Sequence, residues 1–200
     1  MGERTVILAA GDFPRKGGEA RRLLASARRV VACDSAAAAY RRHFGQWPTV
    51  IVGDLDSCPR QPTAVEVVRV PEQETNDLEK AMALCAARGW RDVVIVGATG
   101  KREDHAIGNV FRALVRGLPI VTDHGRFEPV RGCVTLRVRI GAAISIFAPD
   151  PRTCMTSRGL EWPLDGHRFR DLFGATLNRA TAARVMLTST RPAFAYIAFG

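Results

Sequence analysis

The stretch RVVACDSAAAAYRRHFGQWPTVIVGD, residues 29–54, decides the fold. A short β-branched run is followed by a helix-length segment that ends at Gly45, and a second apolar run comes at 48–54. Short strands separated by helices are typical of parallel sheets with crossover helices. The same alternation extends to both sides. Further strands are expected at 5–11, 64–71, 91–98 and 118–123, and further helices at 17–28, 76–89 and 104–117.

We therefore expect residues 1–122 to form an open, mostly parallel α/β sheet with helices on both faces. From about residue 123 the pattern changes to strand-like pieces separated by Gly, Pro and Asp, without a helical period. These pieces lie at 128–132, 133–141, 142–149, 152–159, 160–164, 175–190 and 193–199. They predict a smaller all-β, sandwich-like domain over residues 123–200.

The composition favours a globular protein of the reducing cytoplasm. Of the 200 residues, 46% are hydrophobic, which is enough for a sizeable core. Five scattered cysteines form no CxxC pair, which argues against a disulfide framework and a zinc site. The first apolar run is too short for a signal peptide or a membrane span. The net charge of +9 suits a polyanion such as a nucleotide, and the scattered basic residues without an RNA-binding motif argue against nucleic acid.

Two aspartates, Asp54 and Asp56, stand one residue apart directly after the strand at 48–54. Alternate residues at the end of a strand project to the same side. Two neighbouring carboxylates repel each other and are costly to bury, so we expect a cation between them.

Other polar side chains follow the remaining predicted strands. They are Asp34, Asp77, Lys101, Arg102, Asp104 and His105. Ligands of parallel sheets bind outside the carboxyl ends of the strands, so these residues are expected to converge on one edge. Carboxylate oxygens suit Mg²⁺, and neighbouring cations neutralise phosphate charge, a combination typical of phosphoryl-type transfer. The segment GATGK lacks the spacing of a phosphate-binding loop.

Several of these residues also have a purely structural interpretation. Asp34 can cap the helix that follows it. Asn76 and Glu79 have the spacing of a capping box, which places Asp77 in the first helical turn. Asp104, like His105, begins a predicted helix in the same way.

Four blocks resemble the thiamine pyrophosphokinase family. ACDSAAAAY is similar to the block A-D-G-G-A and keeps Asp34, and VGDLDS matches G-D-x-D-S in full. QETNDLEKA is similar to Q-D-x-T-D-x-x-K-A, with Asn76 in place of Thr. TGKREDH is similar to G-G-R-x-D-H, with Lys101 in place of the second Gly.

The resemblance implies a homodimer that converts ATP and thiamine into AMP and thiamine diphosphate, with Mg²⁺ as cofactor. Asp54, Asp56 and Asp77 match the Mg²⁺-site carboxylates. The rest of the catalytic and ATP-binding set is matched by Asp34, Ser57, Arg102, Asp104 and His105. Lys101, which departs from the family block, is an ATP-binding candidate because its charge suits phosphate. Either Asp77 or Asp104 can accept the hydroxyl proton, and the sequence leaves this open.

In this family thiamine lies at the dimer interface against the β domain. GLEWPL (159–164) resembles G-L-x-[WY]-x-L, and GATLN (174–178) resembles G-T-S-N, with Leu177 where Ser is usual. Trp162, Thr176 and Asn178 are the thiamine-site candidates, although Trp162 can equally be a packing residue. Two alternatives stay open, the same machinery acting on another small alcohol such as a hydroxymethyl-pterin, and a non-catalytic nucleotide- or nucleic-acid-binding module.

Overall fold

The computed structural model describes residues 3–54 and 65–200 and divides the chain into two units. The first comprises the described residues of Met1–Arg112 together with Ile120–Asp123. The second comprises Ala113–Pro119 and His124–Gly200, so the C-terminal end of one helix groups with the β part.

The first unit alternates strands and helices, as the sequence pattern predicts. Its elements are β1 (Thr5–Leu8), α1 (Glu19–Ser26), β2 (Arg29–Cys33), α2 (Asp34–Phe44), β3 (Val50–Gly53), β4 (Glu66–Arg69), α3 (Asp77–Ala87), β5 (Val93–Val96), α4 (Glu103–Arg116, which continues into the second unit) and β6 (Ile120–Val121). The expected strand at 118–123 shortens to two residues, because only Ile120 and Val121 find partners on β5.

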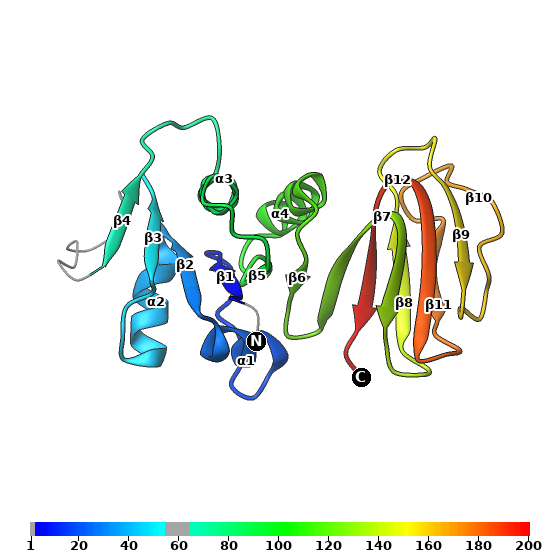
Figure 1. Cartoon of the computed structure of the whole chain (residues 1–200), viewed down its shortest axis with the longest axis horizontal. Coiled ribbons are helices and arrows are strands. Elements are labelled where there is room, and N and C mark those ends of the chain that lie inside the picture. Colours follow the sequence, from blue (N-terminus) through cyan, green and yellow to red (C-terminus); the bar gives the residue numbers. More distant parts are fainter. Residues whose placement is uncertain (1–2, 55–64) are drawn as a thin grey trace. The chain divides into compact units, whose positions relative to one another are not determined.

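The strands of this unit pair in the order β4-β3-β2-β1-β5-β6, and each pair is parallel. Every residue of β1, β3 and β5 is buried, as expected for strands covered on both faces. The chain moves outward from β1 to β4 and then returns to the other side of β1. Because crossover connections are right-handed, the reversal places α1 and α2 on one face and α3 and α4 on the other (Figure 1). The expected mixed α/β fold is confirmed.

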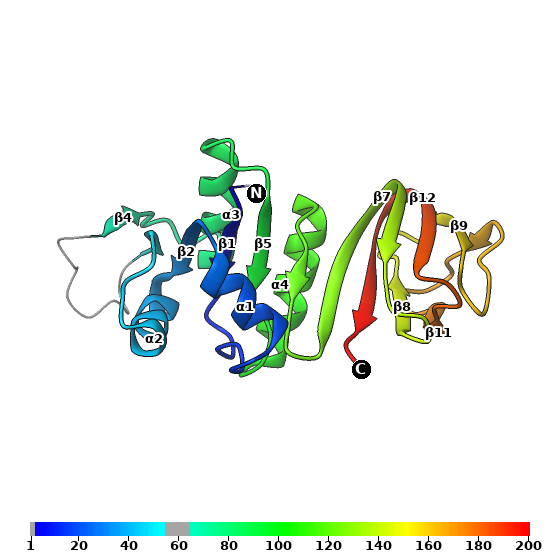
Figure 2. The same ribbon diagram turned by 60° about the horizontal axis from the view of Figure 1, so that its bottom comes forward.

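The second unit contains antiparallel strand pairs. Its strands are β7 (Gly125–Arg137), β8 (Ala143–Phe147), β9 (Cys154–Arg158), β10 (His167–Arg168), β11 (Ala175–Arg179) and β12 (Arg184–Ala198). Strand β12 pairs with β7 along its length, while its other edge pairs with β9 in the first half and with β8 in the second (Figure 2). Fully buried side chains such as Ile144, Phe169 and Leu187 form the core of this unit.

Several details of the β part differ from the sequence expectation. The piece at 175–190 divides into β11 and the first half of β12, β12 continues through the piece at 193–199, and β10 was not expected. The pieces at 128–132 and 133–141 form the single strand β7, because Gly132 adopts a positive φ of 63° and the chain continues through it. Its partner β12 shifts register opposite this point, between Ser189 and Ala193. The piece at 160–164 is not a strand, and only Leu160 forms an isolated bridge, with Ala180.

Candidate active site

Three aspartates meet beside the carboxyl ends of β2 and β3. Asp34 is the first residue of α2, Asp54 directly follows β3, and Asp77 is the first residue of α3. A Cβ atom built on Gly53 would lie 2.8 Å from the Cβ of Asp34 and 3.2 Å from Oδ1 of Asp77. A side chain at position 53 would therefore push these two aspartates apart. The predicted convergence is confirmed for these three residues, which we call the acidic cluster.

The structure decides between the two interpretations of Asp34. The N-cap of α2 is Cys33, and it forms no side-chain capping bond, so Asp34 is not the cap. Asp34 is only 2% exposed, although it is a carboxylate. The capping alternative for this residue is wrong, and its burial beside Asp77 favours a functional role.

Burial raises the pKa of Asp77 above its usual 3.8, and the carboxylates of Asp54 and Asp34 act in the same direction, while Lys80 opposes them. Burial, and then the Asp77 carboxylate, also raise the pKa of the neighbouring Cys33 thiol. Negative charge is thus concentrated at this edge of the sheet, which favours binding of a cation.

Lys80 lies against the acidic cluster and was not singled out from the sequence as a site residue. Its side chain is 3% exposed, and Nζ lies 3.7 Å from Oδ1 of Asp77. A buried ammonium group is costly unless it is paired with negative charge. Two sequence signals point to this residue: Lys80 matches the Lys of the block Q-D-x-T-D-x-x-K-A, and it is spaced i,i+3 from Asp77 on one helix.

The loop before α3 brings a further polar group to Asp54. The Glu72 carboxylate accepts hydrogen bonds from the backbone N–H groups of Glu74 (2.8 Å) and Thr75 (3.0 Å) and from the Thr75 hydroxyl. Gln73, within this turn, donates from Nε2 to Oδ2 of Asp54 at 3.2 Å. The turn therefore holds an amide donor against the acidic cluster.

Asp56 and Ser57 lie outside the described residues. Within residues 3–54 and 65–200, no group of three or more His, Cys, Asp or Glu side chains is arranged to hold a metal ion. The predicted set of Asp54, Asp56 and Asp77 includes a residue beyond this part of the chain, so it stays a prediction.

A second cluster of polar groups forms where the loops after β1 and β5 meet, at the point where the strand order reverses. Gly11 N–H donates to the carbonyl of Gly97 (2.7 Å), and Asp12 N–H donates to the carbonyl of Thr99 (2.8 Å). Gly100, with a φ of 80°, lies so close to Asp12 that a Cβ there would reach the Asp12 carboxylate. Reversal points of parallel sheets are the usual position of nucleotide sites.

Lys101 and Arg102 follow directly on this loop. Lys101 has a φ of 58°, and its Nζ donates to the carbonyl of Ala10 at 2.7 Å. Arg102 pairs with Asp104, with Nη2 and Oδ2 2.6 Å apart. The hydrogen bond from Arg102 lowers the pKa of the Asp104 carboxyl to about 2. Both partners and His105 are exposed and accessible to a ligand.

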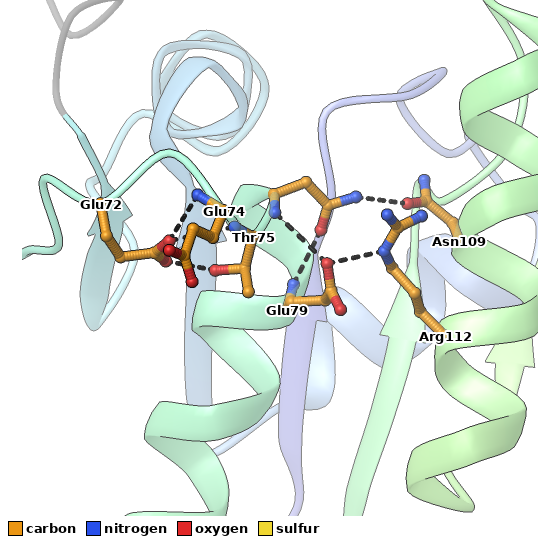
Figure 3. A network of polar contacts seen from close by, with 7 residues as sticks. Glu72, Glu74, Thr75, Glu79, Asn109 and Arg112 are labelled. Atoms are coloured by element: carbon orange, nitrogen blue, oxygen red, sulfur yellow. Dashed lines mark hydrogen bonds and ion pairs between the residues drawn. The ribbon is translucent and has the colours of Figure 1, made fainter.

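A network of hydrogen bonds connects the start of α3 to α4 (Figure 3), and one further bond connects α4 to the segment after β5. Asn76 and Glu79 form the predicted capping box, which is confirmed. Asn76 also donates to Asn109, which donates in turn to the carbonyl of Ala98. Glu79 accepts from Nε of Arg112 at 2.6 Å. Asn109 and Arg112 were not among the sequence candidates, because they are distant from the start of α3 in the chain and match none of the quoted blocks.

The thiamine-site candidates belong to the second unit. Asn178 is buried, and its amide both accepts from the backbone N–H of Trp162 (3.2 Å) and donates to its carbonyl (2.7 Å). The side chain of Trp162 is thereby presented outward and is 57% exposed. Leu177 has a φ of 60° and is 84% exposed, and the partly buried Thr176 precedes it. Asn178 thus orients Trp162 through its backbone.

Similar proteins fall in one family. The family profile described as "Thiamin pyrophosphokinase, catalytic domain" matches residues 20–119. Thiamin pyrophosphokinase 1 of Caenorhabditis elegans is 26% identical over 171 residues, which cover 75% of this chain and 70% of that protein.

Solved structures share the whole fold. The crystal structure of a thiamin pyrophosphokinase family protein from Enterococcus faecalis superimposes with a TM-score of 0.80 at 17% identity, covering 98% of this chain and 99% of that one. Thiamin pyrophosphokinase from Candida albicans gives 0.79 at 12% identity, covering 99% and 90%. Among the described residues, no helix has the length and apolar character needed to span a membrane.

Proposed function

The chain belongs to the thiamin pyrophosphokinase family and is a transferase enzyme, and we propose that it moves a pyrophosphoryl group from ATP to the hydroxyl of thiamine, giving thiamine diphosphate and AMP. The observation that carries this proposal is the convergence of Asp34, Asp54 and Asp77 beside the strand ends. The comparisons give no support to a pterin alcohol as acceptor or to a non-catalytic binding module.

Mg²⁺ fits the residues present. The acidic cluster offers carboxylate oxygens, the ligands that Mg²⁺ prefers, and its mutual repulsion raises the pKa of Asp77 in addition to the effect of burial. We propose that Asp54 and Asp77, with Asp56, hold the ion. When bound, it would offset the charge of the triphosphate and help to orient it.

The residues of the β5–α4 loop supply the remaining charge. Arg102 is exposed and carries a planar guanidinium, which suits the equatorial oxygens of the transferred group. Lys101, at the reversal of the strand order, adds a second cation. The hydroxyl proton passes to Asp77 or Asp104. While its pair with Arg102 is intact, Asp104 is a weak proton acceptor, because its pKa is about 2.

The second unit would bind the acceptor. Thiamine is a cation with two flat rings, and the exposed Trp162 offers an aromatic face for stacking and cation–π attraction. Thr176 and the buried Asn178 would support this surface. We also propose that two chains form a homodimer with thiamine at their interface, and that the protein works in the reducing cytoplasm, where its free thiols remain reduced.

The direct test is to incubate the protein with ATP, Mg²⁺ and thiamine and to measure AMP and thiamine diphosphate. We expect equal amounts of the two products and no turnover after chelation of the metal. Asp54→Asn should lower kcat by about two orders of magnitude or more with a native circular dichroism spectrum, because it removes a proposed ligand charge at a partly buried strand end. Full activity in Asp54→Asn would refute the metal assignment, and thiamine-independent AMP release would refute the acceptor.

A further inference from the structure

One buried side chain, Asn109 of α4, connects two parts of the candidate active site. It is 9% exposed. Its Nδ2 donates to the carbonyl of Ala98 at 2.9 Å, and its Oδ1 accepts from Nδ2 of Asn76 at 3.3 Å. A buried amide with partners on both atoms is fixed in orientation, because either unmade bond would leave a buried polar group unsatisfied.

Asn76 has two simultaneous roles in this contact. Its Oδ1 accepts from the backbone N–H of Glu79 at 2.9 Å, which caps α3, while its Nδ2 reaches Asn109 (Figure 3). The related family block has Thr at this position, and a Thr hydroxyl can also cap a helix. The Asn side chain is longer than that of Thr and has an NH2 group as well as an oxygen. Asn76 therefore keeps the cap of α3 and can also donate a hydrogen bond to Asn109 on α4.

Each end of this bridge is next to a proposed functional residue. Asn76 directly precedes Asp77 of the acidic cluster. Ala98 begins the turn that leads to Lys101 and Arg102. The two hydrogen bonds Asn76–Asn109 and Asn109–Ala98 therefore form a bridge. It connects the segment with Asp77, on the proposed metal side, to the loop with Lys101 and Arg102, on the proposed phosphate side.

We propose that Asn109 is a positioning residue, which holds the start of α3, with Asp77, in register with the β5–α4 loop, with Lys101 and Arg102. The inference rests on the proposed function, because it concerns the alignment of those groups on one triphosphate. Alignment of reacting groups contributes strongly to rate, and displacement by about 1 Å can cost roughly 10²-fold. The expected defect is therefore in kcat more than in binding.

The same helices offer a matched control. Arg112 lies on α4 three residues after Asn109, and its Nε pairs with Glu79 at 2.6 Å. This ion pair also links α3 to α4, but it is partly exposed and makes no contact with the β5–α4 loop among the bonds described. Removing it tests whether any weakening of the α3–α4 contact reproduces the defect.

The experiment compares Asn109→Leu, Asn76→Thr, their combination and Arg112→Gln. Leu has the same branched skeleton as Asn and removes both hydrogen bonds of Asn109. Thr keeps the cap of α3, but its side chain is too short to contact Asn109. For each variant, thermal unfolding, kcat, KM for ATP and thiamine, and calorimetric binding of ATP with Mg²⁺ in the absence of thiamine are measured well below the unfolding temperature.

We expect Asn109→Leu to lower kcat by roughly 10²-fold, with ATP affinity changed less than about threefold. Asn76→Thr should give a smaller loss, about tenfold, because it breaks one of the two bonds and keeps the cap. In the combined variant the two losses should not multiply, because both substitutions break the same bridge. Arg112→Gln should keep kcat within about twofold.

Several results would overturn the inference. If Asn109→Leu lowers only the unfolding temperature, or lowers kcat no more than Arg112→Gln does, Asn109 is merely structural. If the losses multiply in the combined variant, the two residues act independently. If Asn109→Leu does not fold, the kcat of Asn76→Thr decides, and a wild-type value refutes the bridge. Wild-type protein without thiamine-dependent AMP release would overturn the proposed function, and the inference with it.

Discussion

At the scale of single residues, Lys80 is notable because its charged side chain is buried. Its ammonium group is buried beside Asp77, and the same site holds the carboxylates of Asp34 and Asp54. One cation compensates part of the repulsion among three anions. The arrangement allows the three carboxylates to remain close together.

We predict that Lys80→Met lowers the free energy of unfolding at neutral pH by on the order of 2–4 kcal/mol, because it leaves the acidic cluster uncompensated. The effect should depend on pH. The pKa of Asp77 is raised in the folded state, so its contribution to stability declines as the pH rises from below 3.8 through the raised value. Without Lys80 this pKa rises further, and the destabilisation should be smaller near pH 4 than near pH 7.

Urea unfolding of wild type and Lys80→Met at both pH values measures this difference. The exposed Lys16 provides the control, since Lys16→Met removes the same charge from the surface. An equal loss of stability at both pH values would mean that Lys80 stabilises by packing of its alkyl chain and not by charge.

Lys101 is a residue under backbone strain. A φ of 58° disfavours any side chain with a Cβ, and the corresponding family position is Gly. We predict that Lys101→Gly is more stable than Lys101→Ala by about 1 kcal/mol, because both lose the bond to Ala10 and only the backbone preference differs. Val115, on the exposed face of α4, is the control position. There Val115→Gly should be less stable than Val115→Ala, because Gly disfavours helices. Chemical denaturation of the four variants measures the difference in the free energy of unfolding between Gly and Ala at each position. If Ala is the more stable variant at position 101 as well, the backbone of Lys101 is not strained.

At the scale of elements, the sequence was most informative where hydrophobic periodicity and local capping act together. The capping box of α3 and the Gly45 end of α2, with a φ of 72°, were both predicted from spacing and are confirmed. Position alone was a poorer guide for Asp34, because an Asp before a run of Ala is compatible with a cap or with a buried functional group. The structure excludes the cap, because the N-cap of α2 is Cys33, and it places Asp77, which is distant in sequence, next to Asp34.

Long-range pairing explains the elements that the sequence did not predict. Strand β7 passes through Gly132 because its partner β12 changes register at the same level, and neither residue pattern shows this by itself. The bridge from Asn109 to Ala98 joins a helix to the end of a strand. Such contacts depend on the packed fold and cannot be read from local periodicity.

At the scale of the whole molecule, the candidate groups divide between the two units. The first contains the acidic cluster and the β5–α4 loop, and the second contains Trp162, Thr176 and Asn178. The sequence identified members of both groups because its motif blocks occur in both parts. Gln73 and Lys80 match letters of one of these blocks, but their contacts with Asp54 and Asp77 became visible only in the folded chain, and Asn109 was not a sequence candidate.

Exposed apolar side chains in the second unit bear on the proposed homodimer. Trp162 and Leu177 flank the buried Asn178, and both are more than half exposed. Contiguous exposed apolar patches mark interaction surfaces, and we propose that these two side chains belong to one. We predict that the native protein sediments with twice the mass of one chain and that Leu177→Lys weakens self-association by about tenfold or more, because an ammonium would be desolvated at the contact.

Val115 supplies the control for this test, because it is also a strongly exposed apolar residue and lies at the end of α4. Val115→Lys should leave the dimer dissociation constant within about threefold, since a lysine near a helix C-terminus is favourable and its ammonium remains in water. Sedimentation equilibrium over a range of concentrations measures both variants. A monomeric wild type would refute the homodimer, whereas a dimer weakened equally by both substitutions would place the interface away from Leu177 and make net charge the cause.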